Sequence, residues 1–300
     1  MADFAENHLL NLSQALADRA RLARPLVAAI AVPGHRMRSG TLWRKDVVVA
    51  SEQSFPDAGE ANVTLADGST FTAHVAGRDS GTNVVALQLD GTPDPAPLSA
   101  SEPQPGGLAL ALGADDGGIS VRLGVIHSVG PSWHSRAGGR IDRRITLDIG
   151  VTPREEGGPV LDPGGGLLGI STLGPRGRVL VIPAATVEAV LDPLLSKGRV
   201  ERGWLGIALQ PVLVPEALQA GAGQLQGLMV MSVSKDGPAA RANLYAGDIL
   251  MKIAGETVMS PSAVAQYLGP DSVGKQVELH LIRAEKPLSI AVTVGIRPSR

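Results

Sequence analysis

Short apolar segments, many of them alternating apolar and polar positions, run from about residue 25 to about residue 183. Alternation with a period of two is the pattern of a β-strand that has one buried face. Glycine, proline, aspartate and asparagine separate the segments at intervals typical of barrels built from many short strands. Two of these turns, Asp67–Gly68 and Asp162–Gly166, contain the residues that β-hairpins favour. The pattern predicts about a dozen strands.

Helical spacing replaces this alternation at both ends of the strand-rich region. Apolar residues at positions 9, 12, 16 and 20 predict an N-terminal helical segment over 1–24, and Pro25 ends the pattern. A second stripe of four apolar residues predicts a helix over 184–197 that ends before Gly198. The strands are therefore expected to lie between two helices.

The order of the elements divides the chain. A Pro-rich stretch splits the strands into two groups, and we interpret it as a linker between two barrels. A new cycle of strands and helices follows residue 200 and indicates a second domain. The expected bounds are a helical segment at 1–24, a double barrel at 25–200 (barrel one at 25–91, linker at 92–106, barrel two at 107–183, closing helix at 184–197) and a second domain at 201–300.

Composition and charge narrow the class of partner. The 300 residues include 27 basic and 29 acidic side chains, for a formal net charge of −2. No broad electrostatic field favours nucleic acid or an anionic membrane, so we expect neither as a partner. The longest apolar runs, such as Leu26–Val32, have the length of strands, whereas a membrane helix needs about 20 residues.

The absence of cysteine excludes disulfides, thiolate metal sites and a cysteine nucleophile. The N-terminus carries Asp3 and Glu6 where a secretory signal would be basic, and no uninterrupted apolar region follows. These features predict a cytoplasmic protein. We expect no cofactor and no metal site.

Four collinear stretches, which together span roughly residues 20 to 297, resemble the HtrA (DegP/Deg) family of PDZ-containing serine proteases. They are TLADGSTFTAHVAGRDSGTNVVALQLD, LDIGVTPREEGGPVLDPGGGLLGIST, GRVERGWLGIAL and GPAARANLYAGDILMKIAGETV. The resemblance implies a mainly β fold, in which a trypsin-like double β-barrel is followed by one α+β PDZ domain. Fold transfers well between relatives, whereas activity must be argued from the site.

The family's catalytic triad positions hold other residues in this chain. The segment that should supply the histidine has Gln53, or at most Glu52, and the segment that should supply the aspartate has Asn83. The nucleophile turn has Glu156 before Gly157. Serine-protease chemistry needs a hydroxyl, an imidazole and a carboxylate. We therefore expect a pseudoprotease, a protein that is not an enzyme, although a histidine from elsewhere in the chain could substitute in space.

The family's oxyanion hole would be formed by the backbone amides of Glu156 and Arg154, and we expect a degenerate loop at Arg154 and Glu155. One hypothesis is that the Glu156 carboxylate fills the emptied site and pairs with Arg154. A second is that Glu52, Glu155 and Glu156 form a metal cluster or an acid–base pair. A third is that these are solvated loop charges.

A PDZ domain binds a peptide C-terminus by adding it as a strand, and the resemblance assigns the groove. We expect the amides of the loop to hold the terminal carboxylate and apolar side chains to form the pocket. The alternative is that the apolar residues only fill the core. The expected peptide-binding residues are Trp204, Leu205, Gly206, Ile207, Val264, Tyr267 and Leu268.

The function expected from sequence is a non-catalytic peptide-binding, scaffold or chaperone-like protein in protein quality control that binds protein or peptide C-termini. Two alternatives stay open: a regulatory subunit of an active HtrA homologue, and a serine-endopeptidase-type hydrolase with a non-standard site. The placement of Phe4, Leu9, Leu10 and Leu12 resembles that of the N-terminal segments through which the family forms trimers. A homotrimer, a mixed oligomer and a helix packed on its own barrel are all compatible with that placement.

Overall fold

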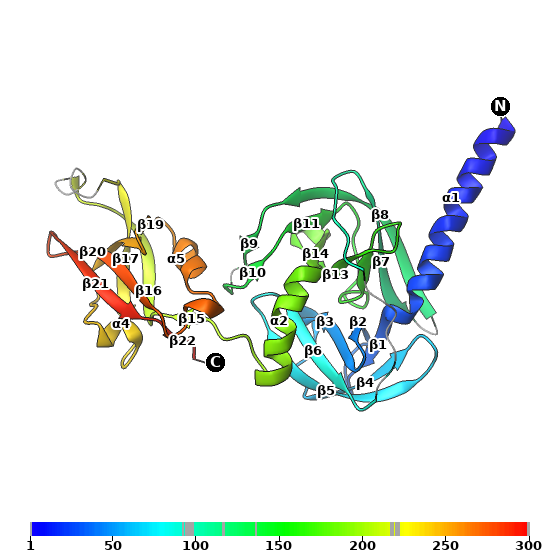
Figure 1. Ribbon diagram of the computed structural model, residues 1–300, viewed down its shortest axis with the longest axis horizontal. Helices are drawn as coiled ribbons and strands as arrows, with labels where there is room; N and C mark the ends of the chain where they lie inside the picture. Colours follow the sequence, from blue (N-terminus) through cyan, green and yellow to red (C-terminus); the bar gives the residue numbers. More distant parts are fainter. Residues whose placement is uncertain are drawn as a thin grey trace. The chain divides into compact units, whose positions relative to one another are not determined.

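The computed structural model describes residues 2–298 except 92, 94–98, 116–117, 136, 217–218 and 220–222, with side chains from residue 7 onward. The chain divides into two compact units (Figure 1). The first contains Met1–Ser135 and Arg140–Val200, and the second contains Arg136–Gly139 and Glu201–Arg300. The bounds predicted for the two domains, 25–200 and 201–300, stay predictions. Of the predicted linker, residues 92 and 94–98 lie outside the described residues.

Six strands of the first unit close into one antiparallel barrel in the order β1-β2-β3-β6-β5-β4. Alternation along the strands places one face of each inside, as in β4, where Ala61, Val63 and Leu65 are buried and their neighbours are less so. The strands are β1 (Val27–Ala31), β2 (Arg38–Arg44), β3 (Val47–Ser51), β4 (Glu60–Leu65), β5 (Thr70–Asp79) and β6 (Val84–Leu89).

Six further strands form a second closed barrel in the order β11-β14-β13-β12-β7-β8. A core of apolar residues from both barrels and from the helix at 184–197 joins them into one unit. The strands are β7 (Leu108–Asp115), β8 (Gly118–Gly130), β11 (Arg144–Leu147), β12 (Pro159–Leu161), β13 (Leu167–Leu173) and β14 (Val179–Pro183), and β9 (Trp133–His134) pairs with β10 (Arg140–Ile141). The prediction of a double barrel is confirmed.

Both predicted hairpin turns are confirmed. Between β4 and β5, Gly68 has a φ of 87° and the Asp67 carboxylate accepts a hydrogen bond of 2.8 Å from the Ser69 amide. Between β12 and β13, the Asp162 carboxylate accepts from the Gly166 amide at 2.9 Å. In each turn the aspartate replaces backbone partners that a tight turn cannot supply.

Helix α1 (Ala2–Ala23) starts earlier than the predicted stripe. Its C-terminal half packs through Leu16 on the barrel core, and Arg19 donates to the Pro163 carbonyl at 2.9 Å. Leu9 and Leu10 remain 69% and 66% exposed. Helix α2 (Ala184–Lys197) buries the predicted stripe in the core. It ends at Gly198, whose φ of 72° permits the amide to bond the Leu194 carbonyl.

The described residues of the first unit include three short 3-10 turns: η1 (Arg24–Leu26), η2 (Glu52–Ser54) and η3 (Pro175–Gly177). The turn η2 follows β3 directly and carries Gln53. Gln53 therefore lies at the end of a strand of the first barrel, and its side chain reaches Glu156 in the second barrel.

The second unit is a sheet with strand order β16-β17-β18-β20-β21, in which β19 pairs with β18. A separate two-stranded ribbon pairs β15 with β22. Helix α5 begins at a cap in which the Ser260 hydroxyl accepts from the Ala263 amide. The elements are β15 (Gly203–Trp204), β16 (Ile207–Leu213), β17 (Gln226–Val233), α4 (Pro238–Arg241), β18 (Ile249–Ile253), β19 (Glu256–Thr257), α5 (Pro261–Tyr267), η4 (Pro270–Ser272), β20 (Gln276–Arg283), β21 (Lys286–Thr293) and β22 (Gly295–Ile296).

In the described part of the chain no helix combines the length and the apolar character needed to span a membrane.

Candidate functional site

The fold brings the three predicted triad positions together from two barrels. Gln53 lies in η2 after β3, Asn83 lies just before β6, and Glu156 lies in the turn between β11 and β12. The Asn83 side chain accepts a hydrogen bond of 2.7 Å from the Gln53 amide. Asn83 has a φ of 60°, a conformation that asparagine tolerates better than most residues. The Asp79 carboxylate accepts hydrogen bonds from the amide and the hydroxyl of Thr82, which orders the backbone directly before Asn83.

Hydrogen-bond donors converge on one oxygen of Glu156. Its Oε1 accepts from the Ser51 hydroxyl at 2.9 Å, the Thr172 hydroxyl at 2.7 Å and the Leu173 amide at 3.0 Å. The Gln53 side-chain amide also donates to this oxygen. Asn83 Nδ2 in turn donates to both hydroxyls, at 3.0 and 2.7 Å. Amides therefore donate to hydroxyls, and the hydroxyls donate to the carboxylate.

This cluster is buried. Glu156 is 2% exposed, Thr172 is 2% exposed and Ser51 is 0% exposed. A carboxylate out of contact with water must have donors in the protein, and the four groups around Oε1 supply them. The interpretation of Glu156 as a solvated loop charge is wrong. The predicted pairing of Glu156 with Arg154 is not found among these bonds, because the turn directs the Arg154 guanidinium to Asp115, 3.4 Å away.

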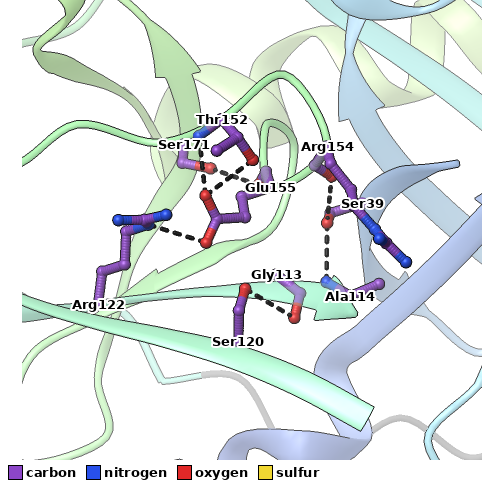
Figure 2. A network of polar contacts seen from close by, with 9 residues as sticks. All are labelled: Ser39, Gly113, Ala114, Ser120, Arg122, Thr152, Arg154, Glu155 and Ser171. Atoms are coloured by element: carbon purple, nitrogen blue, oxygen red, sulfur yellow. Dashed lines mark hydrogen bonds and ion pairs between the residues drawn. The ribbon is translucent and has the colours of Figure 1, made fainter. Parts of the chain in front are cut away.

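Glu155 faces a different set of partners (Figure 2). Its Oε1 lies 2.8 Å from Arg122 Nε, and its Oε2 accepts from the amide and hydroxyl of Thr152 at 2.8 and 2.9 Å. Burial alone would raise the pKa of Glu155, but the bonds from Arg122, Thr152 and Ser120 outweigh it and lower the pKa to about 2. Glu155 is therefore ionised and tied to β8.

The backbone of the turn is anchored on both barrels. The Ser39 hydroxyl in β2 donates to the Arg154 carbonyl at 2.7 Å and accepts from the Ala114 amide in β7 at 2.8 Å (Figure 2). The Thr41 hydroxyl donates to the Gly157 carbonyl at 3.0 Å. The Glu156 amide donates to the Thr152 carbonyl at 3.2 Å. One of the two predicted oxyanion donors is therefore used within the turn.

The metal-cluster hypothesis finds no support in the arrangement. Glu155 and Glu156 bind separate partners, and the described residues contain no group of three His, Cys, Asp or Glu side chains that could hold a metal ion. Ser51 and Thr172 were not predicted as site residues, because both lie inside strands, where serine and threonine are common. Only the closeness of the two barrels makes them neighbours of Glu156.

In the second unit, a hollow of about 220 Å³ lies between the edge strand β16 and helix α5. Six of the seven predicted groove residues line it, and the exception is Tyr267, which packs against the apolar core. The other seven lining residues, among them Arg202 and Arg297, were not predicted. The lining residues are Gly138, Arg202, Gly203, Trp204, Leu205, Gly206, Ile207, Leu209, Pro261, Val264, Ala265, Leu268 and Arg297.

The loop before β16 has the backbone form that close approach of a ligand requires. Gly206 has a φ of 78°, in the left-handed region that favours glycine. A Cβ there would lie 3.2 Å from the Trp204 ring. The Leu205 carbonyl accepts a hydrogen bond from the Ala239 amide, and the Gly206 carbonyl accepts one from the Ser234 amide. These two bonds fix the backbone of the loop.

Comparison with known proteins agrees with this architecture. The sequence profile of the trypsin-like peptidase domain matches residues 38–170, and that of the PDZ domain matches residues 203–294. The solved structure of a serine endoprotease from Yersinia pestis superposes with a TM-score of 0.75 at 24% identity and covers 93% of this chain and 97% of its own. The HtrA-type protease AlgW with tripeptide has a TM-score of 0.75 at 25% identity and covers 95% and 98%.

Curated relatives share more sequence. A probable periplasmic serine endoprotease DegP-like of Brucella suis is 31% identical over 283 residues, which are 89% of this chain and 55% of the relative. A protein with the same description from Halomonas elongata is 33% identical over 253 residues, 80% of this chain and 52% of the relative. The chain spans about half the length of these relatives.

The two domains and their order define a trypsin-like peptidase domain followed by a PDZ domain. The chain is homologous to the DegP/HtrA family. The predicted family and the predicted fold class are confirmed.

Two predictions are contradicted. The prediction that the chain is not an enzyme conflicts with relatives named serine endoproteases, which point to a protease. That prediction inferred a lack of activity from three motif positions, whereas catalytic groups are recognised by geometry and role. The cytoplasmic location conflicts with relatives named periplasmic. The scaffold, chaperone-like and regulatory-subunit roles stay predictions.

Proposed function

We propose that this chain, a member of a family of HtrA-type proteases, binds the C-terminal end of peptides in the groove between β16 and α5. The observation that carries the proposal is the hollow of about 220 Å³, which is lined by the glycine-containing loop at one end and by apolar side chains along both walls. Strand β16 is the first in its sheet, so its outer edge is available to an added strand.

The groove walls fit an apolar terminal side chain. Leu205 and Val264 are buried at 1% and 3% exposure, while Ile207 and Leu268 are half-buried and line the hollow. Val264 and Leu268 lie one turn apart on the helical segment and therefore face the same side. Burial of one large aliphatic side chain contributes about 1.5–3 kcal/mol, enough to select an apolar last residue.

The test is a titration of the full chain with fluorescent ten-residue peptides that end in an apolar residue, followed by anisotropy. We expect saturable binding that is lost when the peptide is amidated, because the terminal carboxylate no longer meets the loop amides. Gly206→Val should abolish binding, since Gly206 has a positive φ and lies against Trp204.

Gly274→Val is the matched control. Gly274 has the same φ of 78° but has open space where a Cβ would point, and it is outside the groove lining. The two variants therefore introduce similar backbone strain in the same unit. Equal loss of binding in both would mean that the effect comes from destabilisation, and flat titrations with the unaltered chain would refute the proposal.

The names of the relatives favour a second candidate function, endopeptidase activity, and a periplasmic location for it. Acyl transfer needs a nucleophile paired with a proton acceptor, and the Ser51 and Thr172 hydroxyls both donate to the Glu156 carboxylate. Both hydroxyls are buried, so this candidate function requires a local movement that opens them to a peptide carbonyl.

Cleavage of casein and of a diverse peptide library by the purified chain tests this candidate. We expect turnover that falls at least about 100-fold in Glu156→Gln, in the range found for loss of a general base. Glu188→Gln, a carboxylate on α2 that bonds Arg44 and is outside the cluster, should cleave normally. Undetectable cleavage by the unaltered chain, or equal rates in both variants, would contradict it.

A further inference from the structure

The side-chain carboxamide of Gln53 lies against a hydroxyl of the other barrel. Gln53 Nε2 is 2.8 Å from Thr172 Oγ1, and Cδ of the same carboxamide is about 1.3 Å from that nitrogen. Gln53 follows β3 in the first barrel, and Thr172 lies in β13 of the second. A carboxamide and a hydroxyl held together in this way are the two reactants of an acyl transfer, in which the hydroxyl is the nucleophile and the nitrogen is the leaving group.

The hydroxyl of Thr172 is oriented for this role. A hydroxyl has one hydrogen to donate and two lone pairs that accept. Thr172 Oγ1 accepts from Asn83 Nδ2 at 2.7 Å and from Gln53 Nε2, and it donates its hydrogen to Glu156 Oε1 at 2.7 Å. A carboxylate that already holds the proton of the nucleophile is placed to act as its general base.

The same carboxylate oxygen also reaches the leaving group. Gln53 Nε2 donates to Glu156 Oε1, so one oxygen contacts both the nucleophile and the nitrogen that must leave. A carboxamide nitrogen leaves as ammonia once it has received a further proton. Glu156 can therefore take the proton from Thr172 and pass it to Gln53 without a second acid.

The other polar side chains of the cluster fit these roles less well. The Asn83 nitrogen bonds the hydroxyls of Ser51 and Thr172, and the Asn83 oxygen is held by the Gln53 backbone amide. Among the bonds of the described residues none joins the Asn83 nitrogen to Glu156, and none joins Ser51 to the Gln53 carboxamide. The reacting pair is therefore Gln53 and Thr172.

We propose that Thr172 and Gln53 form an intramolecular ester that joins the two barrels covalently. The carboxamide turns about its terminal bond, and Thr172 Oγ1 attacks Gln53 Cδ. The Oγ1–Cδ bond forms and the Cδ–Nε2 bond breaks. Glu156 accepts the hydroxyl proton and delivers it to the nitrogen, which leaves as ammonia with the electron pair of the broken bond. Glu156 ends the reaction unchanged, and no other reactant is consumed.

The reaction happens once per molecule, so a slow rate suffices for the ester to accumulate. Well-oriented groups in one molecule react as if present at about 10⁵–10⁸ M. Gln53 is an exposed residue, so ammonia escapes to solvent and the reverse reaction lacks a reactant. The inference concerns the first unit alone and does not depend on peptide binding in the groove.

Intact-mass spectrometry of the full chain tests the proposal. We expect the folded chain, kept at neutral pH for days, to lose about 17 Da, the mass of the ammonia that leaves in the acyl transfer. A sample kept in concentrated urea should keep its mass, because unfolding separates the two residues. Tryptic digestion should yield a linked pair of peptides that contain Gln53 and Thr172, and hydroxylamine, which cleaves esters, should separate them.

Variants assign the reaction to the three groups. Thr172→Val, Glu156→Gln and Gln53→Met should each keep the unreacted mass. Thr172→Ser should still lose ammonia, since it retains a hydroxyl. Gln88→Met is the matched control, because the Gln88 carboxamide belongs to the same barrel and donates to the Asp46 carbonyl at 3.2 Å, outside the cluster. That variant should lose ammonia as the unaltered chain does.

Four results would overturn the proposal. The first is an unchanged mass in a chain whose urea transition shows that it is folded. The second is a loss of ammonia without a linked peptide, as cyclisation at an asparagine would give. The third is a gain of about 1 Da at Gln53, which would mean that water replaces Thr172 as the nucleophile. The fourth is a loss of ammonia that persists in Thr172→Val.

Discussion

Replacing Glu156 by leucine probes the strongest polar cluster in the first unit. The two side chains have similar volumes, so the main change is the loss of an acceptor for four donors: Ser51, Gln53, Thr172 and the Leu173 amide. Gln53 keeps bonds to Thr172 and to the Leu173 carbonyl, at 2.8 and 3.1 Å. The Leu173 amide then loses its acceptor, and of the two buried hydroxyls, which lie 3.3 Å apart, only one can donate to the other.

Each buried donor left without a partner costs about 1–3 kcal/mol, and partial repacking recovers some of it. We therefore expect Glu156→Leu to lower the free energy of unfolding by about 3–5 kcal/mol, the range found when one partner of a buried charged group is removed. Glu156→Gln keeps an acceptor oxygen and loses only the charge assistance, which should cost about 1–2 kcal/mol.

The assay is urea-induced unfolding of the full chain at neutral pH, with hydrogen exchange at the β3 and β13 amides to assign the transition to the first unit. Asp192→Leu serves as control, because Asp192 of α2 forms an exposed pair with Arg44 that is worth about 0–1 kcal/mol. If Glu156→Leu unfolds within about 0.5 kcal/mol of the unaltered chain, the bonds around Oε1 do not hold the two barrels together.

Three further substitutions test other parts of the structure. Because the pKa of Glu155 falls to about 2 in the folded chain, its pairing with Arg122 stabilises the fold above the unfolded pKa, and that stability is lost as pH drops from about 5 to 2; Glu155→Gln should flatten this part of the stability–pH curve. Asp248→Asn breaks the two-bond pair with Arg283, formed at 2.7 Å by a carboxylate that is 1% exposed, and should lower thermal stability by about 2–4 kcal/mol in calorimetry. Gly158→Ala places a Cβ 1.9 Å from the Leu112 carbonyl and should cost at least about 2 kcal/mol in the same experiment. An unchanged curve or melting temperature in any of the three would contradict the corresponding contact.

Much of the fold could be predicted because local patterns decide it. Alternation places Val63 inside barrel one, and the pair Asp67–Gly68 closes the hairpin that follows. The groove could be predicted only through the resemblance to the HtrA family, which assigned the loop around Gly206 and the helix that carries Val264. Six of the seven groove residues predicted in this way line the hollow.

The site between the barrels could be predicted only in part. The resemblance places Gln53, Asn83 and Glu156 at the triad positions, but their partners Ser51 and Thr172 come from strands of two different barrels, and the packing of one barrel on the other sets the distance between them. These two hydroxyls carry no local signal, because serine and threonine are common on sheet faces.

The error concerning Arg154 has a similar origin. Adjacent residues in a tight turn point in different directions, so closeness in sequence to Glu156 did not imply contact. Arg202 and Arg297 illustrate the opposite case, since a strand register brings together residues that no local pattern connects.

The edge of β16 is the proposed binding site for a peptide C-terminus. Backbone amide NMR of the isotope-labelled full chain, titrated with an apolar-ended peptide, locates the bound peptide residue by residue. We expect the largest shift changes to fall on Leu205, Gly206 and Ile207 and to continue along β16 and α5. Saturable shifts confined to other strands, or no shifts at millimolar peptide, would contradict it.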